Sequence, residues 1–375
     1  KLYTAVIEIS KKSTLEQPYK HQILTFLLNI RDINMRVAMY YNNSDIRVEE
    51  MPTPKIGKGE VLFKSLACGI CGSDVMEWYR IHKAPLVLGH EATGEIVEVG
   101  EDVKRFKKGD RVFVSHHVPC NTCHYCLNGN HTVCDSLRST NFDPGGFAEY
   151  VRVPEINVDR GISILPDNMS LEDGTFIEPL ACVVRGQRVA RIEPGQTVVV
   201  IGSGMSGLLH ILLAQSLGAG KIIATDVSEY RMEMARKLGA DSVISAHDDL
   251  PSHILKLNSN RLADRVIVTA GADSALETAL KSVGRGGTIL FFAPGGPDTH
   301  LSVPFNEFWK NCVTLVPTYG ASPLDIEVAI ELISSKRVPV QEMITHRLGL
   351  SEVERGFKLV TEAKESIKVV IEPHK

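Results

Sequence analysis

The sequence lacks any marked excess of one charge. Its 375 residues carry 41 Lys and Arg against 45 Asp and Glu, which gives a formal net charge of −4, and the pI is near 6.4. Binding to nucleic acid or to an anionic membrane calls for clustered Lys and Arg. The basic run at residues 104–111 is interrupted by Phe106 and ends at Gly109 and Asp110, which favours a solvated turn between strands. We therefore expect neither partner.

The chain also lacks long apolar runs, tandem repeats and low-complexity tracts. No stretch approaches the length that spans a bilayer, and the short apolar run at residues 23–30 is not followed by a small-residue cleavage site. With 43% hydrophobic and 23% charged residues, the composition is that of an ordinary soluble globular protein. Residues 1–34 show no cap or turn pattern that links them to the segment beginning at Met35, and we interpret them as an N-terminal extension.

The cysteines are few but unevenly placed. Four of the eight lie within fifteen residues and the others are scattered, which is typical of metal ligands in an intracellular protein rather than of a disulfide framework. The pattern predicts a reducing, cytoplasmic location. The positions are Cys68, Cys71, Cys120, Cys123, Cys126, Cys134, Cys182 and Cys312.

A chain of this length exceeds what one hydrophobic core usually organises, so we expect two domains. From Met35, short strand-like runs separated by Gly and Pro predict a β-rich, partly barrel-like domain. After Glu178, apolar strands alternate with helical patterns, which predicts a Rossmann-type parallel α/β domain at residues 181–322, with the run at 313–320 as its last edge. The final strand resembles the first region, so residues 35–180 and 323–375 are predicted to form one domain.

A glycine-rich motif follows the first strand of the predicted parallel sheet. Gly202, Gly204 and Gly207 form G-x-G-x-x-G and open a helix. The glycines permit a tight turn, a close approach to a pyrophosphate and close packing of helix on strand. Asp226 ends the next strand, where a carboxylate accepts hydrogen bonds from the adenosine ribose and repels a 2′-phosphate. The motif predicts NAD rather than NADP, and a purely structural glycine turn is the alternative.

Four cysteines share one polar loop in the spacing C-x2-C-x2-C-x7-C: Cys120, Cys123, Cys126 and Cys134. Four thiolates this close complete a tetrahedral site and leave no position for a substrate, which predicts a structural zinc ion. An iron–sulfur cluster is the main alternative, although the bacterial ferredoxin spacing has a shorter last gap followed by proline. Unliganded thiols are another. The nearby histidines at positions 116, 117, 124 and 131 are expected to be solvated.

Cys71 and His90 come from two neighbouring segments, CGICGSDV and LGHE. Zinc favours both ligand types. Taken alone, however, a cysteine is more often an ordinary buried thiol, and a histidine more often binds no metal. A dinucleotide site in the same chain favours a catalytic metal, because a Lewis acid that stabilises an alkoxide assists hydride transfer from an alcohol. A third ligand is needed where the domains meet, and Glu178 and Cys182 are the candidates.

From Met35 to its end the chain resembles the zinc-dependent medium-chain alcohol and polyol dehydrogenases, of the sorbitol (L-iditol) dehydrogenase and threonine dehydrogenase type. The matching motifs, in order, are CGICGSDV, LGHEATGEIVEVG, the four-cysteine loop, PGGFAEYV, EPLACVV, VIGSGMSG and DVSEYR. The resemblance implies a GroES-like fold for the β-rich domain beside the Rossmann domain. It also implies one catalytic zinc ion, one structural zinc ion, NAD, and assembly into homodimers or homotetramers.

The resemblance also assigns roles to single residues around the catalytic metal. Cys71, His90 and Glu178 match the zinc ligands, with Glu91 as an alternating ligand or a carboxylate behind them. Asp74 matches the carboxylate that orients the ligating imidazole.

Further roles concern the proton and the cofactor. Ser73 matches the hydroxyl that accepts the alcohol proton, and Asp226 and Arg231 match contacts to the adenosine ribose. Cys182 is then expected to be an ordinary buried thiol. The expected cofactor-binding set is Gly202, Gly204, Met205, Ser206, Gly207, Asp226 and Arg231.

One departure from the family pattern concerns the proton path. Several relatives have a histidine five residues after the cysteine ligand, and Met76 stands at that position here. Either the proton leaves through the nicotinamide ribose and water, or Glu77 or His82 replaces the histidine. The adjoining pocket is then less polar than in those relatives. Its candidate lining residues, which loop or core packing explains equally well, are Thr140, Phe142 and Trp78.

These features predict a cytosolic zinc- and NAD-dependent dehydrogenase that interconverts a secondary alcohol, polyol or sugar-like, and its ketone in a cleft between the domains. The alternative within this class is an enzyme like threonine 3-dehydrogenase, or another amino- or sugar-alcohol dehydrogenase. Alternatives of another kind are a zinc-free quinone or enoyl reductase on the same fold and a non-catalytic NAD-sensing protein.

Overall fold

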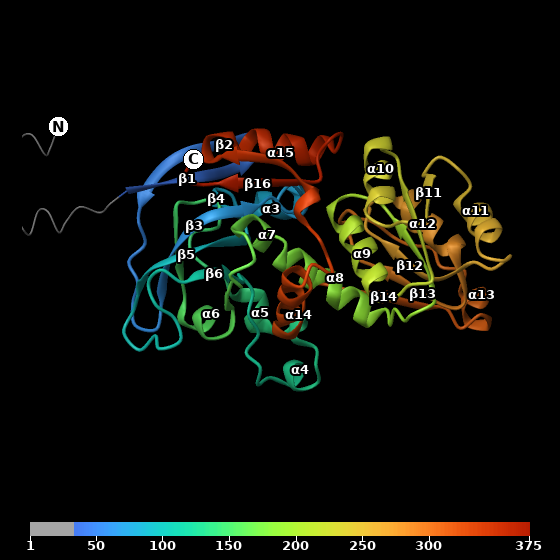
Figure 1. Cartoon of the computed structure of the whole chain (residues 1–375), viewed down its shortest axis with the longest axis horizontal. Helices are drawn as coiled ribbons and strands as arrows, with labels where there is room; N and C mark the ends of the chain where they lie inside the picture. Colours follow the sequence, from blue (N-terminus) through green and yellow to red (C-terminus); the bar gives the residue numbers. More distant parts are fainter. Residues whose placement is uncertain (1–33) are drawn as a thin grey trace, which may run out of the picture.

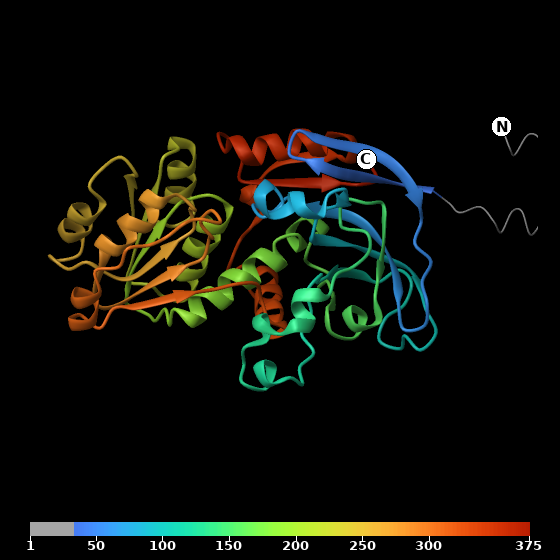
Figure 2. The same ribbon diagram turned by 180° about the vertical axis from the view of Figure 1, so that it is seen from behind.

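The computed structural model describes residues 34–375, so the predicted extension lies outside the described residues except for Asn34. The described chain forms a strand-rich lobe and a layered α/β lobe, with a long helix running between them (Figure 1). The C-terminus lies in the strand-rich lobe, beside the first strands of the described chain (Figure 2). Among residues 34–375, no helix combines the length and apolar character that a bilayer span requires.

Ten strands build the strand-rich lobe. They are β1 (Asn34–Asn42), β2 (Asp45–Pro52), β3 (Val61–Gly69), β4 (Leu86–Val87), β5 (Glu91–Val99), β6 (Arg111–Val114), β7 (Tyr150–Val153), β8 (Ile162–Ile164), β15 (Ile344–Gly349) and β16 (Lys368–Glu372). The larger sheet has the order β15-β16-β3-β5-β6-β8, with β7 also paired to β3, and the smaller has the order β2-β1-β4.

The C-terminal strand rejoins this lobe, as predicted. β16 pairs antiparallel with β3, with Val370 opposite Gly69 and Ile371 opposite Cys68. Both strands are almost wholly buried, which explains their nearly continuous apolar sequences. The pairing brings the start of β16 to the end of β3, next to the segment that carries Cys71.

Short helices make most of the connections in this lobe. They are α3 (Glu77–Arg80), η1 (Ile81–Lys83), α4 (His124–Leu127), η2 (His131–Val133), α5 (Asp135–Ser139), α6 (Glu155–Arg160), α7 (Leu171–Gly174), η3 (Gln341–Met343), η4 (Leu350–Glu352) and α15 (Val353–Glu362). The loop that contains α4 projects from the foot of the molecule in Figure 1. This projection is the four-cysteine loop.

A six-stranded parallel sheet forms the other lobe. Its strands are β9 (Thr197–Ile201), β10 (Lys221–Asp226), β11 (Ser242–Ser245), β12 (Ala263–Val268), β13 (Val283–Phe291) and β14 (Thr314–Pro317), in the order β11-β10-β9-β12-β13-β14. Its helices are α9 (Met205–Ser216), α10 (Glu229–Lys237), α11 (Leu250–Leu257), α12 (Asp273–Ser282) and α13 (Phe305–Lys310). Every residue of the central strand β9 is buried. The edge position of β14 confirms the prediction made from its sequence.

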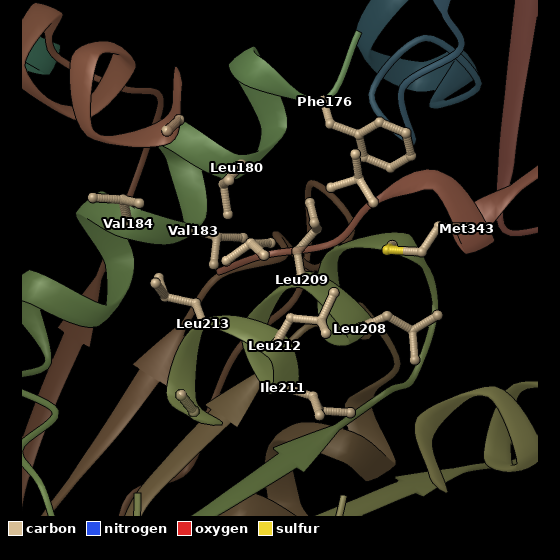
Figure 3. Packing of buried hydrophobic residues seen from close by; sticks show 14 of the residues in the cluster. Phe176, Leu180, Val183, Val184, Leu208, Leu209, Ile211, Leu212, Leu213 and Met343 are labelled. Atoms are coloured by element: carbon tan, nitrogen blue, oxygen red, sulfur yellow. The ribbon is translucent and has the colours of Figure 1, made fainter. Parts of the chain in front are cut away.

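The long helix between the lobes is α8 (Ile177–Val189), and it packs against α9 and against α14 (Pro323–Ser334). Leu180 and Val183 of α8 lie close to Leu209 and Leu212 of α9 in the buried cluster of Figure 3. The helix spans the predicted boundary between the two domains, because it begins four residues before residue 181. A proline at position 179 is tolerated because it falls in the first turn, where backbone N–H groups have no helical partner.

The two lobes confirm the predicted fold class, a Rossmann-type parallel sheet together with a separate β-rich unit. The domain boundaries drawn from the sequence stay a prediction. All six strands of the parallel sheet lie between residues 197 and 317.

Candidate active site

Three potential metal ligands meet where two strands of the strand-rich lobe pair. Cys71 follows the end of β3, and His90 and Glu91 stand at the start of β5. The pairing of Gly69 with Glu91 sets these two strand ends side by side. One ligand atom from each of the three residues lies within 4.8 Å of the others. A thiolate, an imidazole and a carboxylate are a donor set that fits zinc.

Asp74 is buried beside His90. Its Oδ1 lies 3.3 Å from His90 Nδ1, and its Oδ2 accepts a hydrogen bond of 3.0 Å from the backbone N–H of Cys71. Burial alone would lower the pKa of His90, but the charges of Asp74 and Cys71 raise it well above its ordinary value. A carboxylate at Nδ1 leaves the other ring nitrogen for a metal, and the role of Asp74 in orienting this imidazole stays a prediction.

Ser73 lies between Cys71 and an arginine that the sequence did not single out. The Ser73 Oγ is 3.4 Å from Cys71 Sγ. Arg80 donates to this Oγ from Nη2 at 3.0 Å and to the Ser73 carbonyl oxygen from Nε at 2.9 Å. The Arg80 side chain is only 15% exposed and lies 3.6 Å from Asp74 Oδ1. Arg80 ends α3, a four-residue helix that is too short to leave a periodic sequence pattern.

The two residues predicted to replace the relay histidine do not contact Ser73 in the described part of the chain. Glu77 and His82 are both exposed. Within residues 34–375, neither forms a hydrogen bond with Ser73.

Glu91 is held by a lysine from the C-terminal strand. Lys368 Nζ forms an ion pair with Glu91 Oε2, and both side chains are fully buried. Lys368 also donates to the carbonyl oxygen of Thr175 at 3.4 Å. A Cβ on Gly69 would collide with both members of the pair, so the absence of a side chain there makes room for it. The other oxygen, Glu91 Oε1, is buried and has no partner among the described residues, which leaves it available to a metal.

Glu178 stands in the first turn of α8 and lies outside the set of atoms within 4.8 Å. Its carboxylate is nevertheless close: burial raises its pKa, the charge of His90 opposes this shift, and the charge of Glu91 adds to it. Cys182, one helical turn later, donates its thiol to Glu178 Oε1 at 3.4 Å. Burial raises the pKa of Cys182 well above its ordinary value, which agrees with a protonated thiol beside a carboxylate.

The prediction that the histidines near the cysteine loop are solvated is wrong for His116 and His117. The centre of the His116 ring lies 4.7 Å from that of His90, and the centre of the His117 ring lies 3.9 Å from that of His116. His116 Nδ1 is buried without a hydrogen-bond partner in the described part of the chain. Both residues follow β6, whose pairing with β5 carries them to His90. A loop pattern could not reveal this, because it depends on strand pairing.

The three candidate pocket residues differ in what they contact. Phe142 is buried and meets the His116 ring edge-on, with 6.3 Å between ring centres. Thr140 Oγ1 accepts a hydrogen bond of 2.9 Å from the backbone N–H of Val118 and so anchors its loop. Trp78 is 41% exposed and packs on Tyr79. Of the three, Phe142 is the one that borders the histidines.

The four-cysteine loop is arranged for a tetrahedral metal. One sulfur atom from each of the four residues lies within 4.8 Å of the others. The Cys120 sulfur lies 3.6 Å from that of Cys134 and 4.0 Å from that of Cys126. Four thiolates around zinc are separated by about 3.8 Å. Backbone N–H groups of Thr122 and Cys123 point at the Cys120 sulfur and lower its pKa to about 5. The donor set therefore fits zinc.

The glycine-rich loop has the shape that a dinucleotide requires. Gly202 has a φ of 94°, a conformation that favours glycine. A Cβ on Gly207 would collide with the carbonyl oxygen of Gly202, so the turn closes only with glycine there. Asp226 Oδ2 accepts a hydrogen bond of 2.7 Å from the backbone N–H of Ser203. The N-terminus of α9, at residues 205 and 206, and the predicted ribose contact Arg231 border the same loop.

Comparison with known proteins gives concordant matches. Residues 57–160 match the alcohol dehydrogenase GroES-like domain family, and residues 207–335 match the zinc-binding dehydrogenase family. Sorbitol dehydrogenase of Bacillus subtilis is 32% identical over 354 residues, which cover 91% of this chain and 98% of that protein.

Two solved structures share the fold. An alcohol dehydrogenase from Thermus sp. ATN1 is 31% identical, with a TM-score of 0.79 over 90% of this chain and 99% of that chain. A zinc-binding dehydrogenase from Sinorhizobium meliloti, solved bound to NADP, is 25% identical, with a TM-score of 0.81 over 91% of this chain and 99% of that chain.

Proposed function

Because the chain belongs to the zinc-dependent alcohol and polyol dehydrogenases, we propose that it oxidises a secondary alcohol of the polyol kind to its ketone at Cys71, His90 and Glu178, with NAD as the hydride acceptor. The observation that carries this proposal is the meeting of Cys71, His90 and Glu91 within 4.8 Å at the ends of two paired strands. When bound, zinc supplies a Lewis acid that eases loss of the alcohol proton, and the nicotinamide ring accepts the hydride.

Cys71 and His90 act as ligands, and Asp74 holds the imidazole in the tautomer that leaves one ring nitrogen for the metal. The distance of 3.3 Å between Asp74 Oδ1 and His90 Nδ1 supports this role. Glu178 is the third ligand. Glu91 stays behind the ligands while Lys368 neutralises it, and its free Oε1 allows it to alternate with Glu178.

Ser73 accepts the proton of the substrate hydroxyl. Arg80 donates to the Ser73 Oγ, and the Ser73 hydroxyl in turn donates its hydrogen to Cys71 Sγ at 3.4 Å, so the hydroxyl both accepts and donates beside the metal ligand. The guanidinium also places a permanent positive charge beside the oxygen, which favours the more negative form along the proton path. With Met76 in the usual place of the histidine, no imidazole follows Ser73 in the chain at that position, and a bound nicotinamide ribose with water would supply the next group of the path.

The preference for NAD over NADP rests on Asp226. Its two oxygens accept hydrogen bonds from the backbone N–H groups of Ser203 and Ser228, at 2.7 and 2.9 Å. These bonds fix the carboxylate at the end of β10, where a 2′-phosphate would meet a like charge.

Zinc analysis tests the metal assignment. We expect two zinc ions per chain in a zinc-replete preparation, one in Cys120→Ser, and two in the control Cys312→Ser, which alters an exposed thiol. A single ion in the unaltered protein would point to a zinc-free reductase that retains only the cysteine loop.

Activity is tested with a panel of polyols, sugars, amino-alcohols and simple alcohols, by following NADH absorbance with NAD and with NADP. We expect a polyol with NAD to give the highest kcat/KM. Failure of every alcohol to reduce either dinucleotide in the two-zinc protein would favour a non-catalytic NAD-sensing protein.

The proposal extends to a homodimer in which β14 pairs with its copy. β14 is the edge of the parallel sheet, and an exposed edge is usually managed by pairing. The adjacent helix α13 exposes Phe305 and Trp309, at 73% and 69%. Light scattering should give the mass of a dimer or a tetramer. Trp309→Glu should weaken the association of the subunits and so lower the measured mass. A reducing, cytoplasmic location is also proposed, because none of the eight cysteines forms a disulfide bond in the described part of the chain.

A further inference from the structure

Cationic and phenolic side chains gather beside the candidate active site. The Arg80 guanidinium lies 4.8 Å from the centre of the Tyr79 ring, and Lys83 Nζ lies 5.9 Å from the same centre. Tyr319 follows β14 in the other lobe, and it is close enough to Tyr79 and Arg138 for both to influence its ionisation. The group therefore lies where the two lobes face each other.

His117 connects this group to the metal ligands. Its ring is the outer member of the row formed with His116 and His90. Burial, together with the charges of His90, Arg80 and Lys83, lowers the pKa of His117 to about 4. His117 is therefore neutral near pH 7 and can hydrogen-bond a substrate hydroxyl without adding charge.

Only one of the three positive charges of this group, that of Arg80, has a carboxylate partner in the described part of the chain. Asp74 is already occupied by His90 and Arg80. Among residues 34–375, no carboxylate forms an ion pair with Lys83 or Arg138, and both side chains are exposed. Glu77, on the same helix as Arg80, is exposed, and its charge adds to the effect of burial in raising the pKa of Tyr40. This local excess contrasts with the chain as a whole, whose formal net charge is −4.

One nitrogen of the Arg80 guanidinium is available to a ligand. Its Nε and Nη2 are used by Ser73, whereas Nη1 makes no hydrogen bond to any described residue. An arginine nitrogen, an ammonium group and phenolic hydroxyls together form a set that suits the oxygens of a phosphate or a carboxylate.

Resting on the proposed function, we propose that the substrate is an anionic polyol, with its reacting carbinol beside Ser73 and its phosphate or carboxylate group bound by Lys83, Arg138 and the free nitrogen of Arg80. The reaction stays balanced: the carbinol C–H bond breaks and its hydride reduces NAD to NADH, the hydroxyl proton leaves through Ser73, and the ketone forms. The anionic group takes no part in this step and is unchanged by it.

The test compares kcat/KM within matched pairs on the zinc-replete enzyme. Galactitol is paired with galactitol 1-phosphate, glucitol with glucitol 6-phosphate, and glucitol with gluconate, so that the arms separate phosphate from carboxylate. We expect the anionic member of at least one pair to be favoured about tenfold or more, mainly through KM. The preference should fall as ionic strength rises, because salt screens exposed charges.

Variants assign the effect to residues. Lys83→Gln and Arg138→Gln should each reduce the anionic-to-neutral ratio of kcat/KM by about threefold to tenfold, with two zinc ions retained. Lys281→Gln, which removes an exposed lysine of α12, should leave the ratio unchanged. The inference is overturned if neutral polyols are oxidised and no pair favours the anion, or if the preference survives in the Lys83→Gln/Arg138→Gln double variant. If no member of any pair reduces NAD, the proposed function itself fails.

Discussion

The ammonium group of Lys368 is paired with the carboxylate of Glu91, and neither side chain is exposed. Lys368 is the first residue of β16 and Glu91 the first residue of β5, so the pair ties the C-terminal strand to the strand that carries His90. Two buried charges are costly to remove from water, and each depends on the other for compensation.

Lys368→Met should therefore destabilise the protein by about 3–5 kcal/mol, because it leaves a buried carboxylate without its counter-charge. The free energy of unfolding is measured in urea on chelator-treated protein, so that no metal takes over the charge. Adding Glu91→Gln to Lys368→Met should recover part of the loss. Lys358→Met breaks an exposed pair with Glu362 and should cost less than about 1 kcal/mol. An equal loss in the two lysine variants would contradict the prediction.

Sequence reasoning is most informative where the partners are close in the chain. The four cysteines span fifteen residues, and the glycine loop with Asp226 lies within one strand–helix–strand unit, so spacing alone defines the geometry. Arg80 and Lys368 were missed because their roles depend on tertiary contacts. A buried lysine in SIKVVIEP carries no local signal, since its partner Glu91 is 277 positions away.

The prediction for His116 and His117 failed for the same reason, because their contacts also depend on tertiary structure. His116 and His117 belong to a polar loop sequence, and solvent exposure is the natural expectation for it. The β5–β6 pairing instead brings them, half-buried, to the metal ligands, with His116 against His90 and His117 against His116. A residue's distance along the chain from the metal ligands was a poor guide here, because antiparallel pairing joins segments that the sequence separates.

Ser73→Ala should lower kcat by about 100-fold at neutral pH, because the substrate hydroxyl loses its proton acceptor. Ser73→Thr keeps the hydroxyl that Arg80 contacts and should retain most of the rate. Steady-state kinetics with the best polyol, together with the zinc content of each variant, makes the comparison. An unchanged kcat in Ser73→Ala with two zinc ions present would remove Ser73 from the proton path.

Asp226→Ser should shift the cofactor preference toward NADP, because it removes the charge that faces a 2′-phosphate. We expect the ratio of kcat/KM for NADP over NAD to rise about tenfold or more. Asp241→Asn is a matched control: its carboxylate also accepts a backbone N–H, that of Ile222 at 2.7 Å, but at the other end of β10. A similar rise in the control, or none in Asp226→Ser, would show that the Asp226 charge does not set the preference.

His210 should make the parallel-sheet lobe sensitive to acid. It is fully buried in α9, where Gln187 donates to its Nδ1 at 3.1 Å and its Nε2 has no partner among the described residues. Burial lowers its pKa to about 3. Between this value and the ordinary value of about 6.5, the unfolded chain binds a proton that the folded chain does not.

Stability from this group is therefore complete above pH 6.5 and is lost as the pH falls toward 3, by up to about 1.4 kcal/mol per pH unit. His210→Leu removes the titrating ring and should flatten the fall in Tm between pH 6.5 and 5, whatever its effect at pH 7.5. His124→Leu, which alters an exposed histidine, should keep the unaltered slope. Thermal unfolding across this pH range measures both slopes, and parallel curves for His210→Leu and the unaltered protein would refute the assignment.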